Sequence, residues 1–318
     1  SKQGRSDWHP SNRGLWTSSS PRPYPPIFWE KNPMVNSSIA PLIAGAFLGL
    51  SALATLCRWR GVQGWLGMAG LVTLLGTLVA RGLYAGHWPL TNQYEFLLAF
   101  AVTTALAALL SKKGRTIASG PDSLIPSKEP RSTGAKNLSI STVAIVQTIT
   151  LLLAAALALY AYLGLPASYR GLLPLPPAID SIWFPFHVGV AALAYGAFAL
   201  AGVAGGTYLL NPASRSPASF LINQAVAAGY PLLTLSILLG MIWAQRAWGR
   251  YWDWDVKEVW TLGTWLVFTL YWHLRHRPRW QGSRLAWLAM IGLGMVLMTL
   301  LGVGPLARAV GLTSLHLF

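Results

Sequence analysis

Hydrophobic residues dominate eight long stretches of this chain, and short polar segments separate them. Each stretch approaches the roughly 20 mostly apolar residues that a helix needs to cross the hydrocarbon core of a bilayer. The pattern predicts eight membrane-spanning helices, at about 38–57, 62–81, 91–110, 141–163, 184–210, 219–244, 257–274 and 284–304. Because lipid cannot satisfy the exposed backbone of an open strand, we expect an all-α polytopic membrane protein.

Two polar segments interrupt this pattern. Residues 1–36 are polar, basic and rich in proline and tryptophan, and they lack the apolar run of a signal peptide. We expect them to form an extracytoplasmic tail, followed by an eight-helix domain over residues 37–318. Residues 111–139 are polar and rich in lysine and arginine, and they predict an internal basic loop.

Composition narrows the class of protein further. Hydrophobic residues make up 53% of the chain and charged residues 10%, which excludes both an ordinary soluble domain and a disordered chain. The single cysteine, Cys57, excludes a disulfide framework and a paired-cysteine redox site. The net charge of +15 could suggest nucleic acid, but the basic residues are scattered through short loops. Membrane topology explains them better, so we expect no nucleic-acid partner.

Lysine and arginine are more frequent in one alternate set of loops than in the other. The richer set contains Arg58, Arg60, the 111–139 loop, Arg215, Arg275, Arg277, Arg279 and Arg284. The poorer set contains Arg81, Arg170, Arg246, Arg250, Lys257 and Arg308. Because cytoplasmic loops are enriched in positive charge, this asymmetry predicts that both termini lie on the extracytoplasmic side.

Tryptophan is concentrated around the end of the sixth stretch. Seven of the 16 tryptophans lie between Trp243 and Trp272, where the sequence reads WAQRAWGRYWDWDVKEVWTLGTW from Trp243 onward. An aromatic belt at the membrane interface would explain the tryptophans, but not the acids and bases placed among them. Flat indoles with a few charged groups suit a large, planar, partly polar ligand.

This segment closely resembles the tryptophan-rich "WWD" signature of membrane proteins that handle haem in cytochrome c maturation. Four further motifs are similar to the CcsA (ResC) type of that family: HWPLTNQYEF at 87–96, WFPFHVGVAALAYGAF at 183–198, WHLR at 272–275 and SLHLF at 314–318. The resemblance covers roughly residues 60–318 and includes the eight-helix count. It implies a subunit of a System II holocytochrome c synthase, which transports haem across the membrane and presents it to apocytochrome c for covalent thioether attachment.

Two histidines are expected on the outer face beside the tryptophan-rich loop. His187 begins the fifth stretch from the outside, and His316 follows the eighth. Around an aromatic platform, two neutral imidazoles would clamp haem iron from both sides. The resemblance implies the same role, as the two external axial ligands. His9 and His276 are interpreted as solvated, and His87 as interfacial.

His273 differs because it lies within the seventh stretch, near its inner end. A hydrogen-bonded or snorkelling histidine explains this position as well as a functional one does. The resemblance implies a third axial ligand, for haem inside the membrane. It also implies that a CcsB/ResB-type partner chain supplies the second intramembrane histidine.

The resemblance implies that haem b binds over an external WWD loop at 243–260. We expect the contacts to come from Trp243, Trp248, Trp252, Trp254, Asp255, Trp260, Arg246 and Arg250. Haem propionates would be bound by Arg246, Arg250 or Lys257, because anions prefer these side chains. Asp255 and Glu258 could form salt bridges, orient a histidine or position the apocytochrome. No residue is assigned a catalytic role.

Two other functions share the WWD loop: a haem exporter of the CcmC type, which performs no ligation, and a structural subunit of a larger membrane complex. The eight-helix count and the 87–96 motif favour the CcsA type over the exporter. Its partners would include an apocytochrome c with a CxxCH segment and thiol-reducing proteins, because the chain, with Cys57 alone, cannot itself keep the two cysteines of that segment reduced. The expected location is a bacterial plasma membrane or a thylakoid membrane, with the site on the extracytoplasmic or lumenal side.

Overall fold

The computed structural model describes residues 38–59, 61–111, 141–172 and 175–303. These residues form helices and connecting loops and contain no strand. The long helices are α2 (Ala40–Leu56), α3 (Val62–Ala85), α4 (Gln93–Leu110), α6 (Thr142–Leu159), α7 (Trp183–Leu210), α8 (Arg215–Trp248), α9 (Val256–Leu274) and α10 (Ser283–Leu297). The short helical turns are η2 (Tyr160–Gly164), η3 (Ala167–Arg170), η4 (Pro212–Ser214), η5 (Pro278–Trp280) and η6 (Met298–Gly302).

Each predicted apolar stretch overlaps one of these long helices, and α3 and α8 extend several residues beyond their stretches. Within the described ranges, six helical segments are long and apolar enough to cross a membrane: α3, α4, α6 with η2, α7, η4 with α8, and α10 with η6. The remaining two are α2, which has 17 residues, and α9, which contains Lys257, Glu258 and His273. The all-α expectation is therefore confirmed for the described residues, whereas a count of eight spans stays a prediction. The tail at 1–36 and nearly all of the 111–139 loop lie outside the described residues.

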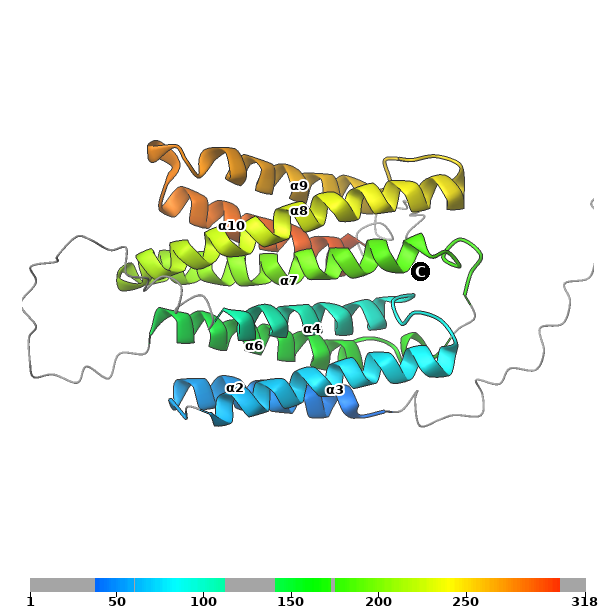
Figure 1. Ribbon diagram of the computed structural model, residues 1–318, viewed down its shortest axis with the longest axis horizontal. Coiled ribbons are helices and arrows are strands. Elements are labelled where there is room, and N and C mark those ends of the chain that lie inside the picture. Colours follow the sequence, from blue (N-terminus) through cyan, green and yellow to red (C-terminus); the bar gives the residue numbers. More distant parts are fainter. Residues whose placement is uncertain (1–37, 60, 112–140, 173–174, 304–318) are drawn as a thin grey trace, which may run out of the picture.

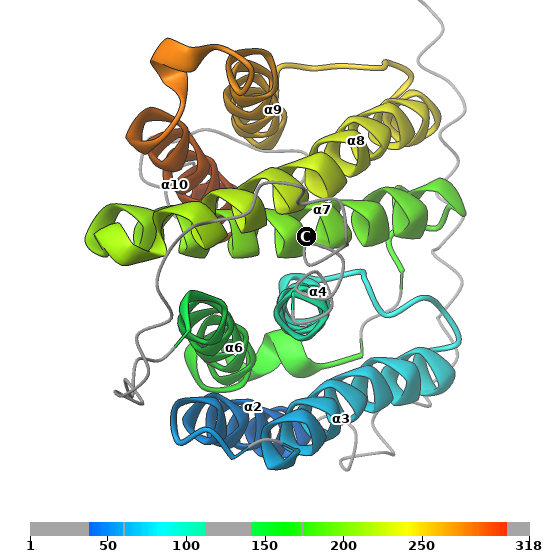
Figure 2. The ribbon, with the colours of Figure 1, turned by 60° about the vertical axis from the view of Figure 1, so that its left-hand side comes forward.

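The helices are stacked in pairs (Figure 2). Helices α2 and α3 pack against each other and against α4 and α6, which in turn contact α7. Helices α7 and α8 share the most extensive contact in the described part of the chain, and α9 and α10 cover their other side. Helix α7 therefore lies at the centre of the bundle, between the two halves of the chain.

Successive long helices run in opposite directions, so their connections alternate between the two ends of the bundle (Figure 1). The connections at 86–92, at 165–172 with 175–182, and at 249–255 lie at one end, on the right of Figure 1. We call this end the cavity end, after the cavity that its loops line. The turn between α9 and α10 lies at the opposite end.

Arg81, which was counted among the loop charges that predict the orientation in the membrane, lies inside a helix instead. The apolar run was expected to end at residue 81, in a loop, but α3 continues to Ala85 and Arg81 is buried within it. The guanidinium of Arg81 pairs with the carboxylate of Glu95, with Nε and Oε1 2.9 Å apart. Arg81 therefore adds no free charge to the loops of the cavity end, and the orientation in the membrane stays a prediction.

Glycine allows the helices to approach closely at the centre of the bundle. The stacked rings of Phe198 on α7 and Phe268 on α9 lie with centroids 3.6 Å apart. A Cβ on Gly229 of α8 would lie 2.6 Å from the first ring, and one on Gly292 of α10 would lie 2.3 Å from the second. Because small residues let membrane helices pack backbone to backbone, this contact joins α7, α8, α9 and α10.

The crossing of α4 and α7 provides a test of this packing. A Cβ on Gly196 would lie 2.6 Å from the backbone carbonyl carbon of Thr103, which cannot move without displacing α4. We expect Gly196→Ala to destabilise the protein by about 1–3 kcal/mol, as overpacked cores do, and to lower the melting temperature measured in detergent. The matched control is Gly76→Ala on α3, where a Cβ would meet no atom within 4 Å. An unchanged melting temperature for Gly196→Ala would contradict this packing.

Candidate functional site

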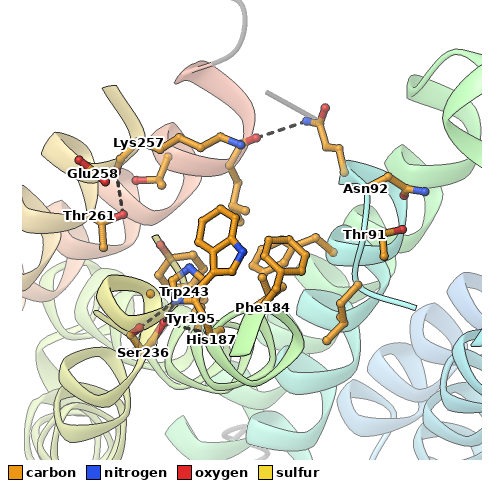
Figure 3. A pocket seen from close by; sticks show the side chains of 18 of the residues that line it. Thr91, Asn92, Phe184, His187, Tyr195, Ser236, Trp243, Lys257, Glu258 and Thr261 are labelled. Atoms are coloured by element: carbon orange, nitrogen blue, oxygen red, sulfur yellow. Dashed lines mark hydrogen bonds between the residues drawn. The ribbon is translucent and has the colours of Figure 1, made fainter. Parts of the chain in front are cut away.

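A cavity of about 490 Å³ lies at the cavity end of the bundle. Its walls come from the loop before α4 and α4 itself, from η2, η3 and the residues between them, from η6, and from α7, α8, the loop after α8 and α9. Figure 3 shows His187, Tyr195, Ser236 and Trp243 gathered on one side, with Lys257, Glu258 and Thr261 above them and Thr91 and Asn92 opposite. A volume of this size falls in the range of cavities that bind cofactors and other small molecules.

His187 is the only described histidine that lines this cavity. It lies in the first two turns of α7, and its Nδ1 is 2.8 Å from the backbone carbonyl oxygen of Ser236 on α8. Because a carbonyl oxygen only accepts hydrogen bonds, Nδ1 must donate, and the ring lone pair is then on Nε2. The hydroxyl of Ser236 also donates to the backbone carbonyl of His187, with a separation of 3.0 Å.

Gly240 makes room for this imidazole one helical turn after Ser236. A Cβ at Gly240 would lie 2.8 Å from both Cε1 and Nδ1 of His187. On its next turn α8 presents Trp243, whose indole is nearly parallel to the imidazole, at 9° with ring centroids 6.2 Å apart. The spacing of Ser236, Gly240 and Trp243 along one face of α8 therefore determines where the imidazole lies.

Trp243 is buried, with 1% of its surface exposed, and its indole links several segments. The indole Nε1 donates to the backbone carbonyl of Ala178, 2.8 Å away, which ties the connection before α7 to α8. Phe184 packs against the indole with ring centroids 5.0 Å apart. The aromatic floor of the cavity is therefore a packed and hydrogen-bonded unit rather than an exposed belt.

The loop from Gly249 to Asp255 connects this floor to α9. Gly249 ends α8 in the left-handed conformation, with φ of 74°, as glycine does after many helices. The side chain of Asp255 accepts a hydrogen bond from the amide of Lys257, and Glu258 Oε2 accepts from the amides of Asp253 and Asp255. This capping box begins α9 and brings Lys257, Glu258 and Thr261 into the cavity lining.

The loop before α4 forms the opposite wall. Asn92 caps α4 by accepting a hydrogen bond from the amide of Glu95, and Leu90, Thr91 and Gln93 line the cavity beside it. These residues belong to the HWPLTNQYEF motif at 87–96. The sequence argument associated that motif with the family, but it did not assign the motif to a wall of the site.

Two of the eight loop residues expected to contact haem line the cavity, Trp243 and Trp252. The indole nitrogen of Trp252 is buried and has no hydrogen-bond partner in the part of the chain that the structure describes. Trp248 packs edge-on against Trp243, outside the lining. Trp254 is 70% exposed and has a positive φ of 57°, and Trp260 is half-buried on α9 away from the cavity.

The three charged residues of that set have other contacts. Asp255 caps the N-terminus of α9, which is a local, structural role. The guanidinium of Arg246 lies 4.9 Å from the ring centre of Trp183, and Arg250 pairs with Asp253. Of the three basic residues expected to bind the propionates, Arg246, Arg250 and Lys257, the one that lines the cavity is Lys257.

Of the other two expected iron ligands, the structure places only His273, which lies away from the cavity. His273 is exposed near the end of α9 at the opposite end of the bundle, and its Nδ1 lies 2.8 Å from the backbone carbonyl of Thr269. It is 16 residues from Lys257, which corresponds to about 24 Å along a helix. His316 lies outside the described residues.

Several cavity residues were not expected from the sequence. Phe96, Phe184, Tyr195 and Ser236 line the cavity from α4, α7 and α8. Phe96 belongs to the 87–96 motif, and Phe184 and Tyr195 belong to the 183–198 motif, whereas the sequence around Ser236 is typical of any packed apolar helix.

Comparison with known proteins identifies the class of this chain as a membrane protein of cytochrome c assembly. A family model described as "Cytochrome C assembly protein" matches residues 130–309. The chain belongs to this family and, within it, to the CcsA type of cytochrome c biogenesis protein.

The relatives of this type include proteins from cyanobacteria and algae. The chain is 30% identical over 320 residues to the cytochrome c biogenesis protein CcsA of Synechococcus elongatus, covering 80% of this chain and 90% of the relative. It is also 30% identical over 267 residues to CcsA of Guillardia theta, covering 74% and 80%. For CcsA of Chlamydomonas reinhardtii, the identity is 30% over 301 residues, covering 91% and 76%.

Family membership confirms the coarse interpretation of the sequence. The chain is a multi-pass membrane protein with a role in cytochrome c maturation. Membership also implies that it handles haem within a maturation system that has further partners.

The capping box at the start of α9 generates a prediction about the cavity rim. We expect Asp255→Ala to lower the free energy of unfolding by about 1 kcal/mol, because it removes the N-cap acceptor. Hydrogen exchange at the amides of residues 256–258 should become faster. The control is Asp253→Ala, which removes only an exposed ion pair worth about 0–1 kcal/mol. Equal exchange at these amides in both variants would show that the cap does not order the rim.

Proposed function

We propose that this protein binds haem b in the cavity and presents it to apocytochrome c for covalent attachment, as a subunit of a System II holocytochrome c synthase. The observation that carries the proposal is the imidazole of His187, which lines a cavity with an aromatic floor while its Nδ1 is held by the Ser236 carbonyl. Iron-binding histidines commonly donate their second nitrogen to a carbonyl or carboxylate in this way.

The lining of the cavity fits a haem. Phe96 offers an aromatic side chain to a flat macrocycle, and Leu233 and Ile237 add apolar contacts. Phe184 and Trp243 pack against each other and close the floor beneath it. Lys257 suits a propionate, and the buried indole nitrogen of Trp252 suits a polar edge of the ligand. The described residues contain no group of three or more His, Cys, Asp or Glu side chains that could hold a bare metal ion. An iron that brings its own macrocycle needs only one or two protein ligands.

In the proposed mechanism, His187 and His316 hold the haem iron while a CxxCH segment approaches the exposed edge. Each cysteine S–H adds across one vinyl C=C bond: the sulfur bonds to one vinyl carbon and the hydrogen goes to the other, so no group leaves and no oxidant is consumed. The histidine of the CxxCH segment then replaces one of the two protein ligands. The protein contributes by positioning the reactants, which can lower a barrier by roughly 7–11 kcal/mol.

The proposed route begins at the opposite end of the bundle. His273 is exposed on α9, which leaves its ring accessible to an imidazole from a CcsB/ResB-type partner chain. Haem would bind there first and then move to His187. This route requires eight membrane spans with both termini on the extracytoplasmic side, which agrees with the alternating direction of the described helices (Figure 1). Thiol-reducing proteins would keep the CxxCH segment reduced.

The proposal is tested by reconstituting the chain with its partner, haem and a CxxCH peptide. Covalent attachment, measured as haem-coupled peptide by mass spectrometry, is the expected result. Bound haem that is never attached would indicate an exporter of the CcmC type. Absence of haem binding, measured by absorbance, would overturn the proposal and favour a structural subunit.

The role of His187 generates a specific prediction. We expect His187→Ala to abolish attachment and to change the absorbance of bound haem, because one axial ligand is lost. Added imidazole should partly restore both, since it can fill the vacated iron position. The control is His276→Ala, at the exposed opposite end, which should attach haem normally. Normal attachment by His187→Ala would exclude this histidine as a ligand.

Gly240 allows a second test of the same ligand. We expect Gly240→Ala to weaken haem binding by about tenfold or more, because its methyl group would displace the imidazole 2.8 Å away. When His187 is already alanine, the methyl group has nothing to displace. The double variant should therefore bind haem as His187→Ala does, and a double-mutant cycle should show strong coupling. Additive losses would mean that Gly240 acts independently of the imidazole.

A further inference from the structure

A buried ion pair joins the ends of α3 and α4 beside the cavity but outside its lining. Nε of Arg81 and Oε1 of Glu95 are 2.9 Å apart, and the two side chains are 2% and 1% exposed. Neither residue lines the cavity. The mechanism proposed above therefore leaves this pair without a role.

Glu95 connects the pair to the first wall of the cavity. Its second oxygen, Oε2, accepts hydrogen bonds from the backbone amide of Thr91 at 2.9 Å and from the Thr91 hydroxyl at 3.0 Å. The Glu95 amide in turn donates to Asn92. Thr91 and Asn92 both line the cavity, so this carboxylate orders the wall formed by the loop before α4.

Arg81 connects the pair to a second wall, almost 90 residues further along the chain. Its Nη1 donates to the backbone carbonyl of Arg170 at 2.8 Å, and its Nη2 donates to the carbonyl of Gly171 at 3.3 Å. These carbonyls end the η3 turn, which follows Leu165 and Pro166 and includes Tyr169 in the cavity lining. A single guanidinium therefore contacts the carboxylate and the second loop at the same time.

Stability alone does not account for a pair of this kind. Removing two charges from water costs about as much as their attraction returns, and well-packed apolar side chains of similar volume often replace a buried pair without loss. What apolar side chains cannot reproduce is the geometry. The planar guanidinium forms hydrogen bonds in fixed directions, and the carboxylate supplies two acceptors.

We propose that Arg81 and Glu95 are positioning residues, which hold the 87–93 and 165–171 walls at the separation that the ligand of the cavity requires. The walls are otherwise connections between helices, which are the parts of a bundle that move most readily. The identity of the ligand as haem is the only part of this proposal that rests on the proposed function. The ordering of the two walls is a property of the protein without ligand.

The experiment compares three proteins: the wild type, the single variant Arg81→Lys, and a double variant that combines Arg81→Met and Glu95→Leu. The double variant removes both charges together, so no unpaired charge stays buried. Arg81→Lys keeps the charge but loses the fork that reaches three acceptors. The matched control is Arg215→Met, an exposed arginine at the opposite end of the bundle. Hydrogen exchange is measured on the full chain in detergent without haem, and haem affinity is then measured by titration.

We expect the double variant to lose exchange protection in residues 87–93 and 165–171 while α7 and α8 keep theirs. Its haem affinity should fall by about tenfold, as it does when residues that orient ligands are removed. Arg81→Lys should keep protection at Thr91 and lose it at 170–171. Unchanged protection in both walls would overturn the proposal, and so would loss of protection throughout the bundle, which would indicate a general structural role.

The two proposals fail in distinguishable ways. If the wild type binds no haem, the proposed function is wrong, while the exchange measurements still decide whether the pair orders the walls. If the walls loosen in the double variant and haem affinity stays at the wild-type value, the ordering is real, and the claim that this separation matters for the ligand is wrong.

Discussion

The close contact of α7 with α8 is the constraint on which the site depends. Ser236 offers its backbone carbonyl to His187, and this is possible only because Gly240 has no side chain at the point where the imidazole meets α8. The same seam continues toward the centre of the bundle, where Gly229 meets Phe198. Because glycines let these two helices pack closely along their length, a side chain at the end of their interface has little rotational freedom. The orientation of the imidazole is therefore set by the packing of the membrane domain.

The cavity is asymmetric, and this asymmetry matches the character of the proposed ligand. Its floor consists of aromatic and aliphatic side chains from α7 and α8, whereas its rim contains Lys257 and Glu258 on one side and Thr91 and Asn92 on the other. A flat molecule with an apolar body and a charged edge would take one orientation in such a space. Capping interactions of α4 and α9 place both rims, so the residues that begin these helices also shape the site.

The sequence predicted the helices well because a membrane makes the requirement local: a run of apolar residues must satisfy its own backbone. It also predicted that the tryptophan-rich segment belongs to the site. It could not separate Trp243 and Trp252, which line the cavity, from Trp254 and Trp260, which do not. A loop has no periodicity from which the direction of a side chain can be inferred, and the neighbours of each indole come from distant segments.

Arg81 and Glu95 show a second limit of prediction from sequence. The second apolar stretch was predicted to end at residue 81, so Arg81 was counted among the loop charges. Its partner is 14 residues away on another helix, and its other acceptors are carbonyls near residue 170. Contacts of this kind depend on the tertiary structure, so they become visible only when the helices have been placed.

The wider helical turns η2 and η6 have a consequence for how this fold can vary. Both are π-helical, both extend a helix at the cavity end, and both contribute to the lining, through Tyr160 and Gly164 in one case and Thr299 to Leu301 in the other. Such a turn accommodates an inserted residue without breaking the helix. Deleting that residue would restore regular winding at the turn itself. A change in length of a single residue at either place would therefore change which side chains of the turn face the cavity, while the helix before it stayed intact.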